Sequence, residues 1–509
     1  MKIINIFSVS CLFLPLLLLK PVVLDVSKSD VNERESPVIT RDIDVAKTFR
    51  EFPNLTGYWN TSIQKTPAPI LAKVAEETLG KAKITKCWLN LDEMWDYRDK
   101  EFEYNHKLGV DKYKKVEEKW RESWDWQEES PSTFYQYMDA FSNSSEEIML
   151  TIRRYERDVL DGKLPISLED WKMVFKAGLK HYKQKYPKIR YVEVGNEYAV
   201  GAFMDGTAEE YFTFYRLGSQ AVVEINEELG LQEENKILVG GPVVTGHILD
   251  KIDKFLQFYS EEPTSKRRLD FVAWHDYDKS IETSSNRQEE IIELLKKYDI
   301  PHNLPLFMTE HDPYHFREDK PEYHFMNAAY LPKSLYFSSI KSPRVRIFPW
   351  VLFHNSEIQT KFMWFDGPNE VDTKASEIRT LPIGFSMKLL SMLRGREAVV
   401  NNIVDGKDLV LATTEGNRLV VEAINYSGER QVKLNIENLL SIFPGMKGKK
   451  VQLKKYVIDS RHNNSLSKEY NSKSLFKPTE VQEIELTDKL VLVHDKLEDK
   501  GIVLWELVK

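Results

Sequence analysis

The feature that most constrains the fold is a regular alternation of short, strand-like apolar runs with longer amphipathic stretches. Eight such runs occur before residue 353, and segments of helical periodicity lie between them. This alternation is typical of parallel α/β folds. The eight runs are residues 55–61, 84–91, 148–155, 191–195, 237–244, 271–274, 305–309 and 345–352.

Two of the amphipathic stretches carry helix-start signals. Ser167 precedes the acidic pair Glu169-Asp170, and Thr207 precedes a pair of glutamates. A Ser or Thr followed by acids in the first turn is a common helix N-terminus. Eight strand–helix repeats over this length predict a (β/α)₈ TIM barrel. A doubly wound sheet is the alternative, but no Gly-rich phosphate loop follows any of the runs.

The residue pattern changes after residue 381. Short alternating runs such as DLVLATT, RLVVEAINYS and GIVLWELV are separated by Gly, Asn and Lys clusters, which predicts an accessory C-terminal β-sandwich. The segment PVITRDIDV near the N-terminus is also strand-like, and we expect it to pair with that sandwich. The predicted domains are an N-terminal segment at 25–54, a catalytic barrel at 55–384 and a sandwich at 385–509.

The first residues have the layout of a secretory signal peptide. Lys2 is followed by an apolar run to Leu19, so residues 1–24 are expected to direct the protein to the exterior or the periplasm. A membrane anchor is disfavoured because the run is short and contains Pro15. A surface lipoprotein modified at Cys11 fits poorly, because the apolar run continues past that residue.

Composition excludes some functions and bounds others. The formal net charge is −8 without long single-sign blocks, which argues against a general nucleic-acid binder. After removal of the signal, Cys87 is the one remaining cysteine, so no intramolecular disulfide is possible. Its apolar surroundings, KITKCWLNL, predict a packing role, with a catalytic thiol as the alternative.

Two carboxylates follow predicted barrel strands directly. Glu197 follows the fourth strand and Glu310 the seventh, and active sites of such barrels lie at the C-terminal ends of the strands. These strands face each other across the barrel mouth. Two opposed carboxylates are what glycoside hydrolysis needs: one protonates the leaving oxygen, and the other attacks or activates water. Glu197 is expected to be the acid/base, with Asn196 holding a substrate hydroxyl. The alternative is that Glu197 and Glu310 are ordinary surface carboxylates at strand ends.

Several segments of this sequence resemble a known family of enzymes. The segments are YVEVGNEY, GTAEEYFTFYRLGSQAV, ILVGGPVVTG, LDFVAWHDYD, LPLFMTEHDPY and RTLPIGFSMKLLSMLRG. Together they are similar to clan A retaining glycoside hydrolases, above all to glycoside hydrolase family 39, which contains β-xylosidases and α-L-iduronidases. The resemblance covers residues 190–385 and is faint before residue 180. Family 86, with its agarases and porphyranases, is an alternative in the same clan.

The resemblance implies roles for individual residues. It makes Glu310 the nucleophile and Glu197 the acid/base of a double displacement, with the two carboxyl groups about 5–5.5 Å apart. His275 and Tyr277 correspond to positions that orient the nucleophile, and Trp350 to the floor of the reacting-sugar subsite. The sequence departs from the family pattern where Gly195 and Tyr198 flank the Asn-Glu pair, and where His311 and Asp312 follow the nucleophile.

A group of histidines lies between the sixth and eighth predicted strands. His311 and His315 have i, i+4 spacing, but Pro313 between them disfavours the helix that a metal site of this spacing needs. We therefore expect no metal and no organic cofactor. His311, together with His315, His324 and Arg317, instead suggests contacts to an acidic or sulfated sugar.

The sequence thus predicts an exported retaining glycosidase that acts on an oligo- or polysaccharide, with a carbohydrate as its partner and no nucleic acid or stable membrane insertion. The competing class is a non-catalytic carbohydrate-binding protein on the same scaffold, which the presence of both Glu197 and Glu310 disfavours. A third class is a metal-dependent hydrolase built on a barrel.

Overall fold

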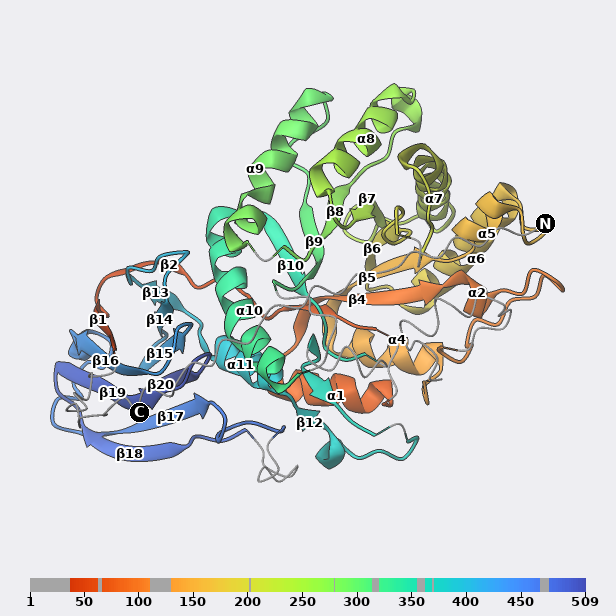
Figure 1. Ribbon diagram of the computed structural model, residues 1–509. Helices are drawn as coiled ribbons and strands as arrows, with labels where there is room; N and C mark the ends of the chain where they lie inside the picture. The colour runs from red at the N-terminus through yellow and green to blue at the C-terminus, as the bar shows by residue number, and fades with distance from the viewer. Residues whose placement is uncertain are drawn as a thin grey trace, which may run out of the picture. The chain divides into compact units, whose positions relative to one another are not determined.

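A computed structural model describes residues 37–62, 66–109, 130–200, 203–278, 280–313, 320–354, 362–368, 370–466 and 476–509 (Figure 1). The signal peptide predicted at residues 1–24 lies outside the described residues, as do His315 and Arg317. Within the described part of the chain, no helix is both long and apolar enough to cross a membrane.

Eight parallel strands form one sheet in which every strand pairs with its neighbours in chain order. The first and last strands meet, because the rings of Tyr58 and Phe348 lie 5.4 Å apart and the Leu352 N–H donates to the Asn60 carbonyl at 3.0 Å. The predicted eight-stranded barrel is therefore confirmed. Its strands are β3 (Tyr58–Asn60), β4 (Ala82–Asn90), β5 (Ser145–Arg153), β6 (Ile189–Val194), β7 (Leu238–Val244), β8 (Phe271–Asp276), β9 (Leu306–His311) and β10 (Val345–Pro349).

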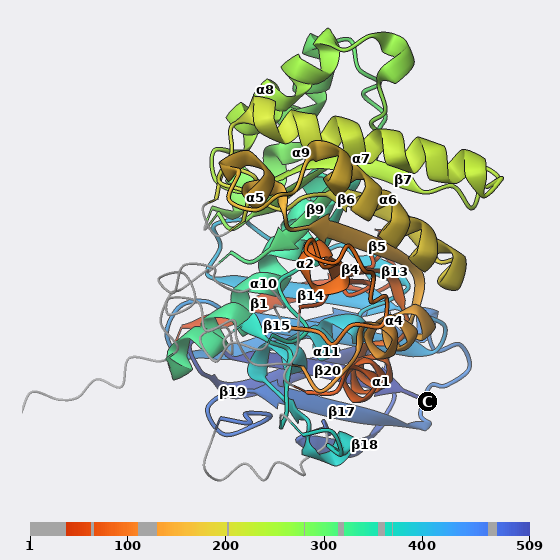
Figure 2. The ribbon, with the colours of Figure 1, turned by 90° about the vertical axis from the view of Figure 1, so that its right-hand side faces the viewer.

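Helices alternate with these strands and cover the outside of the sheet (Figures 1 and 2). The two predicted helix starts are confirmed: Ser167 and Thr207 each accept a hydrogen bond from the third residue of the helix and form a capping box. The helices are α1 (Ala68–Leu79), α2 (Leu91–Met94), α4 (Phe134–Asn143), α5 (Glu156–Asp161), α6 (Leu168–Lys185), α7 (Ala208–Glu228), α8 (Ile248–Glu261), α9 (Ile281–Lys297), α10 (Pro321–Lys341) and α11 (Pro382–Met392), with 3₁₀ turns at Thr264–Lys266, Ala375–Glu377 and Leu439–Ser441.

The C-terminal region forms two sheets that share an apolar core. A seven-stranded sheet has the order β18-β17-β20-β15-β14-β13-β2, and a three-stranded sheet has the order β1-β16-β19. Residues of both sheets, such as Ile39, Leu434 and Val421, belong to one buried cluster. The strands are β1 (Val38–Asp44), β2 (Thr48–Glu51), β13 (Arg396–Ala398), β14 (Asp408–Thr414), β15 (Arg418–Asn425), β16 (Arg430–Glu437), β17 (Lys450–Ile458), β18 (Glu480–Glu485), β19 (Lys489–Leu497) and β20 (Ile502–Val508); a small hairpin joins β11 (Phe365–Asp366) to β12 (Arg379–Thr380).

The N-terminal segment contributes one strand to each sheet of the sandwich before it enters the barrel. β1 pairs in parallel with β16, and β2 pairs antiparallel with β13. Contacts also join the sandwich to the barrel helix α10: the Tyr426 hydroxyl donates to the Ala329 carbonyl at 3.2 Å, and the Tyr336 hydroxyl donates to Glu397 at 2.6 Å.

Cys87 is fully buried in β4, as its apolar surroundings predicted. Burial raises the pKa of its thiol to about 12, so the thiolate that a cysteine nucleophile needs is not formed near neutral pH. The position of Cys87 in the barrel wall is that of a packing residue.

Candidate active site

The interior of the barrel is filled by two layers of different character. An aromatic layer lies toward the N-terminal ends of the strands and consists of Tyr58, Tyr191, Phe271, Phe307 and Phe348, whose rings pack against one another. Because strand side chains alternate between faces, interior positions recur every second residue. The next interior positions on four strands are polar or charged: Asn60, Lys86, Thr151 and Glu193.

Glu310 reaches this polar layer because β9 contains an extra residue. Met308 pairs with Trp274 and Glu310 pairs with His275, which leaves Thr309 without a partner on β8. The pairing with β10 shows the same shift. Strict alternation from Phe307 would place Thr309 inside the barrel, whereas a bulge re-aims the following side chain. The bulge therefore turns the Glu310 carboxylate toward the centre of the mouth.

Glu197 is held in a tight turn just beyond the end of β6. Gly195 has φ +76°, a conformation that favours glycine, and a side chain there would also approach the ring of Tyr211. Glu197 itself has φ +46°, and its N–H donates to the Val243 carbonyl at 2.8 Å. At Gly195, where the sequence departs from the family pattern, the backbone of this chain thus has a conformation that a residue without a side chain adopts most readily.

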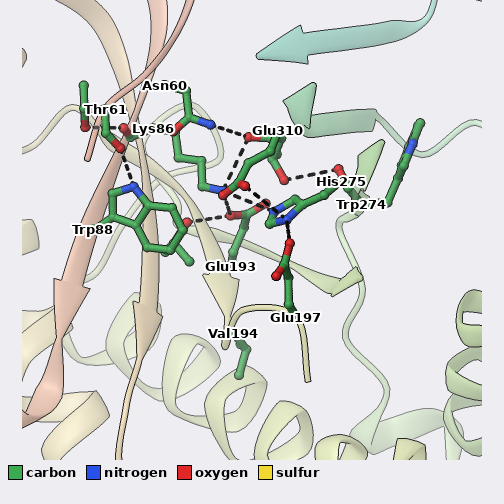
Figure 3. Close-up of polar contacts among 12 residues, drawn as sticks. Asn60, Thr61, Lys86, Trp88, Glu193, Val194, Glu197, Trp274, His275 and Glu310 are labelled. Atoms are coloured by element: carbon green, nitrogen blue, oxygen red, sulfur yellow. Dashed lines mark hydrogen bonds and ion pairs between the residues drawn. The ribbon is translucent and has the colours of Figure 1, made fainter. Parts of the chain in front are cut away.

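His275 joins the two carboxylates. Its Nδ1 lies 2.7 Å from Glu197 Oε1 and 3.4 Å from Glu310 Oε2 (Figure 3). One ring nitrogen and one oxygen of each carboxylate all lie within 4.8 Å of one another. This spacing is close to the roughly 5–5.5 Å of retaining glycosidases and well below the roughly 6.5–9.5 Å of inverting ones.

Lys86 lies at the centre of the polar layer, and its side chain is fully buried. Its Nζ donates to Glu310 Oε1 at 3.0 Å and lies 3.5 Å from Glu193 Oε2 and 3.4 Å from His275 Nε2 (Figure 3). Its Nζ also lies over the ring of Trp88, 4.4 Å from the ring centroid. The ammonium therefore faces three strands at once.

The two glutamates at the mouth have different electrostatic surroundings. Burial raises the pKa of Glu197 to about 7, although the positive charges of Lys86, Lys251 and Arg153 act in the opposite direction. Glu310 instead accepts hydrogen bonds from the Lys86 ammonium and from the Tyr277 hydroxyl. Two carboxyl groups with such unlike surroundings are suited to separate acid and nucleophile roles.

His275 and Tyr277 stay uncharged in this site. Burial lowers the pKa of His275 to about 4, so the imidazole is neutral near neutral pH. Burial also raises the pKa of Tyr277 well above its ordinary value, and the charges of Glu310 and Glu197 act in the same direction. Tyr277 therefore keeps the proton with which it donates to Glu310.

Most of the residues expected to contact substrate lie near the two carboxylates. Asn196 is buried beside Glu197, and its Oδ1 accepts no hydrogen bond within the described residues. Trp350 follows β10, and its backbone N–H donates to the carbonyl of His311, the residue after Glu310. Tyr277 contacts Glu310 directly. The structure therefore brings Asn196, Tyr277 and Trp350 to the same end of the barrel.

The expectation for His311 needs correction. His311 is fully buried; its Nδ1 lies 2.8 Å from the Asp276 carbonyl oxygen and its Nε2 lies 2.7 Å from the Ser334 hydroxyl. Both ring nitrogens are thus used inside the wall of the barrel, which leaves none for a substrate. His324 is also buried, on the surrounding helix α10.

Lys86 and Glu193 are site residues that sequence reasoning missed. Each is a charged residue two positions after an apolar residue that faces the barrel interior, Ile84 or Tyr191. The rule of alternating faces would have placed both charges inside the barrel. The signal was therefore present, but it could be read only after the interior face of each strand was known.

The acid–histidine–acid group could in principle present ligands to a metal, since its donor atoms lie within 4.8 Å of one another. However, the Lys86 ammonium lies 3.0 Å from Glu310 and already supplies a positive charge at this point. A cation bound by the same carboxylate would experience repulsion in a buried environment of low dielectric constant. The donor set therefore fits a metal poorly.

Comparison with known proteins identifies the family of the chain. The model of the family described as glycosyl hydrolases family 39 matches residues 149–471, which is more than half of the chain. The chain belongs to glycosyl hydrolase family 39. The matched segment contains Glu197, His275 and Glu310 and extends into the sandwich.

Individual relatives show how far the likeness reaches. A β-xylosidase of Caldicellulosiruptor saccharolyticus is 30% identical over 175 residues, which cover 30% of this chain and 33% of the relative. The alignment thus spans about a third of that relative. A family 39 enzyme from Xanthomonas axonopodis pv. citri has 15% identity and a TM-score of 0.65, with coverage of 93% of this chain and 98% of the other.

A monomeric β-xylosidase from Caulobacter crescentus CB15 also has 15% identity, with a TM-score of 0.60 and coverage of 93% of this chain and 99% of the other. At this level of identity the two structures show a shared fold. That fold covers the barrel and the sandwich together, because the alignments extend over nearly the whole chain.

Proposed function

We propose that this family 39 protein hydrolyses an O-glycosidic bond with retention of configuration, with Glu310 as nucleophile and Glu197 as acid/base. The observation that carries the proposal is the close approach of the two carboxylates, one oxygen of each lying within 4.8 Å of the other. Such a short approach matches the roughly 5–5.5 Å between the carboxyl groups of retaining enzymes and lies well below the roughly 6.5–9.5 Å of inverting enzymes.

The first step forms a bond between Glu310 and the sugar. A Glu310 oxygen attacks the anomeric carbon while the glycosidic C–O bond breaks, and Glu197 gives its proton to the departing oxygen. The pKa of Glu197, raised to about 7 by burial, keeps this proton available near neutral pH. Tyr277 and Lys86 hold the attacking carboxylate through their hydrogen bonds.

The second step releases the sugar. Glu197, now ionised, takes a proton from a water molecule, and the resulting hydroxide attacks the anomeric carbon as the ester bond to Glu310 breaks. Asn196 is suited to hold a hydroxyl of the reacting sugar, because its Oδ1 is buried and accepts no bond from the described residues. Each step leaves the enzyme with the protonation state that the next one needs.

The substrate we propose first is a β-linked xyloside. The support is that two of the relatives are β-xylosidases, from Caldicellulosiruptor and Caulobacter. A non-catalytic binding protein is disfavoured, because such a protein would not need a buried acid with a raised pKa beside a hydrogen-bonded carboxylate.

The alternative to a neutral xyloside is an acidic or sulfated substrate. Its support is a pair of cations near the acid, Lys251 and Arg153, whose charges both lower the pKa of Glu197. His311 does not favour such a substrate, since both of its ring nitrogens are bonded internally. Matched aryl β-xylosides and aryl α-L-iduronides separate the two substrates: higher kcat/KM on the iduronide would favour the acidic sugar.

The deciding experiment is covalent labelling with the dinitrophenyl glycoside of a fluorinated xylose, followed by peptide mapping. The fluorine slows release of the sugar, so the ester should accumulate on Glu310, and Glu310→Gln should not be labelled. A label on another residue would overturn the assignment of the nucleophile. Product analysis of the early reaction by NMR should show retained anomeric configuration, and inversion would overturn the mechanism.

A further inference from the structure

We propose that Lys86 is a positioning residue that sets the working state of both carboxylates: its ammonium keeps Glu310 ionised and directs the proton of His275 toward Glu197. The proposal rests on the proposed function and adds a residue to it. Lys86 lies on the second barrel strand, far in sequence from the two glutamates, and contacts Glu310 and His275 from the opposite side of the mouth (Figure 3).

The first half of the proposal follows from the charges around Lys86. Two carboxylates face its Nζ, Glu310 Oε1 at 3.0 Å and Glu193 Oε2 at 3.5 Å, and all three side chains are almost completely inaccessible to solvent. An opposite charge at such a distance favours the ionised form of a carboxyl group, and burial strengthens the effect. The nucleophile needs that form.

Glu193 keeps Lys86 in place. Its Oε2 also accepts a hydrogen bond from the Thr151 hydroxyl at 2.6 Å, so its carboxylate is fixed from the neighbouring strand β5. Lys86 Nζ further lies 3.4 Å from the Thr309 carbonyl, which itself accepts a bond from the Asn60 amide at 2.9 Å. The ammonium is therefore aimed at the bulge of β9 that presents Glu310.

The second half of the proposal concerns the tautomer of His275. An ammonium group can only donate hydrogen bonds, so His275 Nε2, at 3.4 Å from Lys86 Nζ, must present its lone pair. The proton of the neutral ring then lies on Nδ1, which is 2.7 Å from Glu197 Oε1. Because Oε1 accepts this bond, the transferable proton of Glu197 belongs on Oε2.

Burial raises the pKa of Glu197 and lowers that of His275, and charged groups near Lys86 act on both residues as well. The positive charge of Lys86 lowers the pKa of both Glu197 and His275. The Arg153 guanidinium on β5 lies over the Trp88 ring, 4.2 Å from its centroid, and its charge also lowers the pKa of Glu197. Tyr277 donates to the second oxygen of Glu310.

The test measures the acidic limb of the pH profile with the dinitrophenyl xyloside, whose leaving group needs no proton from Glu197. The limb then reports the ionisation of Glu310. Loss of the ammonium in Lys86→Met should raise the apparent pKa of this acidic limb by roughly 1–3 units, the usual effect of one nearby opposite charge. Activity should return as the pH rises, which a purely structural loss would not show. An unchanged limb in Lys86→Met would overturn the proposal.

Two further variants make the direction of the shift decisive. Glu193→Gln removes a negative charge but retains Lys86, so the limb should move to lower pH, opposite to Lys86→Met. Lys86→Arg retains the charge and should keep the limb nearer the wild-type position. Shifts of Lys86→Met and Glu193→Gln in the same direction, or a Lys86→Arg limb equal to that of Lys86→Met, would contradict the proposal. If Lys86→Met does not fold, the other two variants decide.

Lys183→Met is the matched control. Lys183 on α6 is also buried, and its Nζ donates to the carbonyls of Pro187 and Ile189 at 2.7 and 2.8 Å, just before and at the start of β6. Its loss should lower thermal stability and leave the acidic limb in place. A shift of the limb in this variant would mean that any buried lysine has the effect.

A measurement without substrate separates this proposal from the proposed function. Infrared titration of the carboxyl band, assigned through Glu310→Gln, gives the pKa of Glu310 directly in the wild type and in Lys86→Met. If the wild type is inactive and is not labelled at Glu310, the proposed function fails, while the infrared shift still tests Lys86. If labelling occurs at Glu310 but Lys86→Met changes neither the apparent pKa of the acidic limb nor the infrared pKa of Glu310, the proposed role of Lys86 is wrong and the proposed function stands.

Discussion

The barrel and the sandwich each bury a glutamate on a strand, and the two glutamates have opposite surroundings. Glu310 accepts hydrogen bonds from Lys86 and Tyr277 and lies beside His275. Glu422 in β15 is completely buried, and neither of its carboxylate oxygens has a hydrogen-bond partner within the described residues.

Burial alone therefore does not make a carboxyl group functional. Burial raises the pKa of Glu422 to about 8, so this residue is neutral at neutral pH and behaves as a polar side chain in an apolar core. Glu310 is buried beside two hydrogen-bond donors, the Lys86 ammonium and the Tyr277 hydroxyl. The comparison predicts that removal of the first glutamate changes activity and removal of the second changes stability.

The largest effect should come from Glu310→Gln, which should lower kcat by roughly 10⁴-fold or more, as expected for loss of a nucleophile. Glu422→Gln, the same chemical change in the sandwich, should leave kcat unchanged. Steady-state kinetics on an aryl β-xyloside measures both. Comparable losses in the two variants would mean that the barrel glutamate has no special role.

Glu197→Ala should slow glycosides with poor leaving groups by roughly 10²–10⁴-fold, the usual contribution of a general acid. Dinitrophenyl glycosides should be affected far less in the step that releases the leaving group. Azide should restore turnover and give a glycosyl azide of retained configuration. Near-normal hydrolysis of the natural glycan by this variant would remove Glu197 from the mechanism.

The pH profile distinguishes the two catalytic glutamates. Glu197 acts in its protonated form, and its pKa of about 7 means that kcat/KM for poor leaving groups should fall above neutral pH, about tenfold per unit. The dinitrophenyl glycoside should lack this alkaline limb when glycosylation is rate-limiting. An alkaline limb that is identical for both substrates would assign it to another group.

The smallest effect concerns the stability of the sandwich. The pKa of Glu422 is raised from an ordinary value of 4.5 to about 8, so the folded state binds its proton more tightly than the unfolded state. The contribution of Glu422 to the free energy of unfolding of the wild type should thus be greatest below pH 4.5. It should fall by about 1.4 kcal/mol per pH unit between pH 4.5 and pH 8.

Glu422→Gln should remove this pH dependence and should be the more stable protein at pH 8. Chemical unfolding of both proteins at pH 5 and at pH 8 measures the difference directly. Equal slopes in the two proteins would show that Glu422 is solvated or paired in solution.

The sequence by itself determined the architecture and the positions of the two mouth carboxylates. Eight apolar runs at regular intervals can bury their surface only as a parallel sheet covered by helices, and the strand count places Glu197 and Glu310 after the fourth and seventh strands. Capping residues such as Ser167 and Thr207 act within one turn of a helix, so local sequence was enough to locate them.

Only the tertiary structure decided which side chains meet in the barrel mouth. Lys86 faces Glu310 because strands separated by more than 200 residues converge there, and Glu310 itself faces inward because a bulge at Thr309 interrupts the alternation of β9. The same arrangement turns His311 toward Ser334 and away from any substrate. Periodicity assigns faces only along an uninterrupted strand, whereas register shifts and contacts between distant strands depend on how the whole barrel closes.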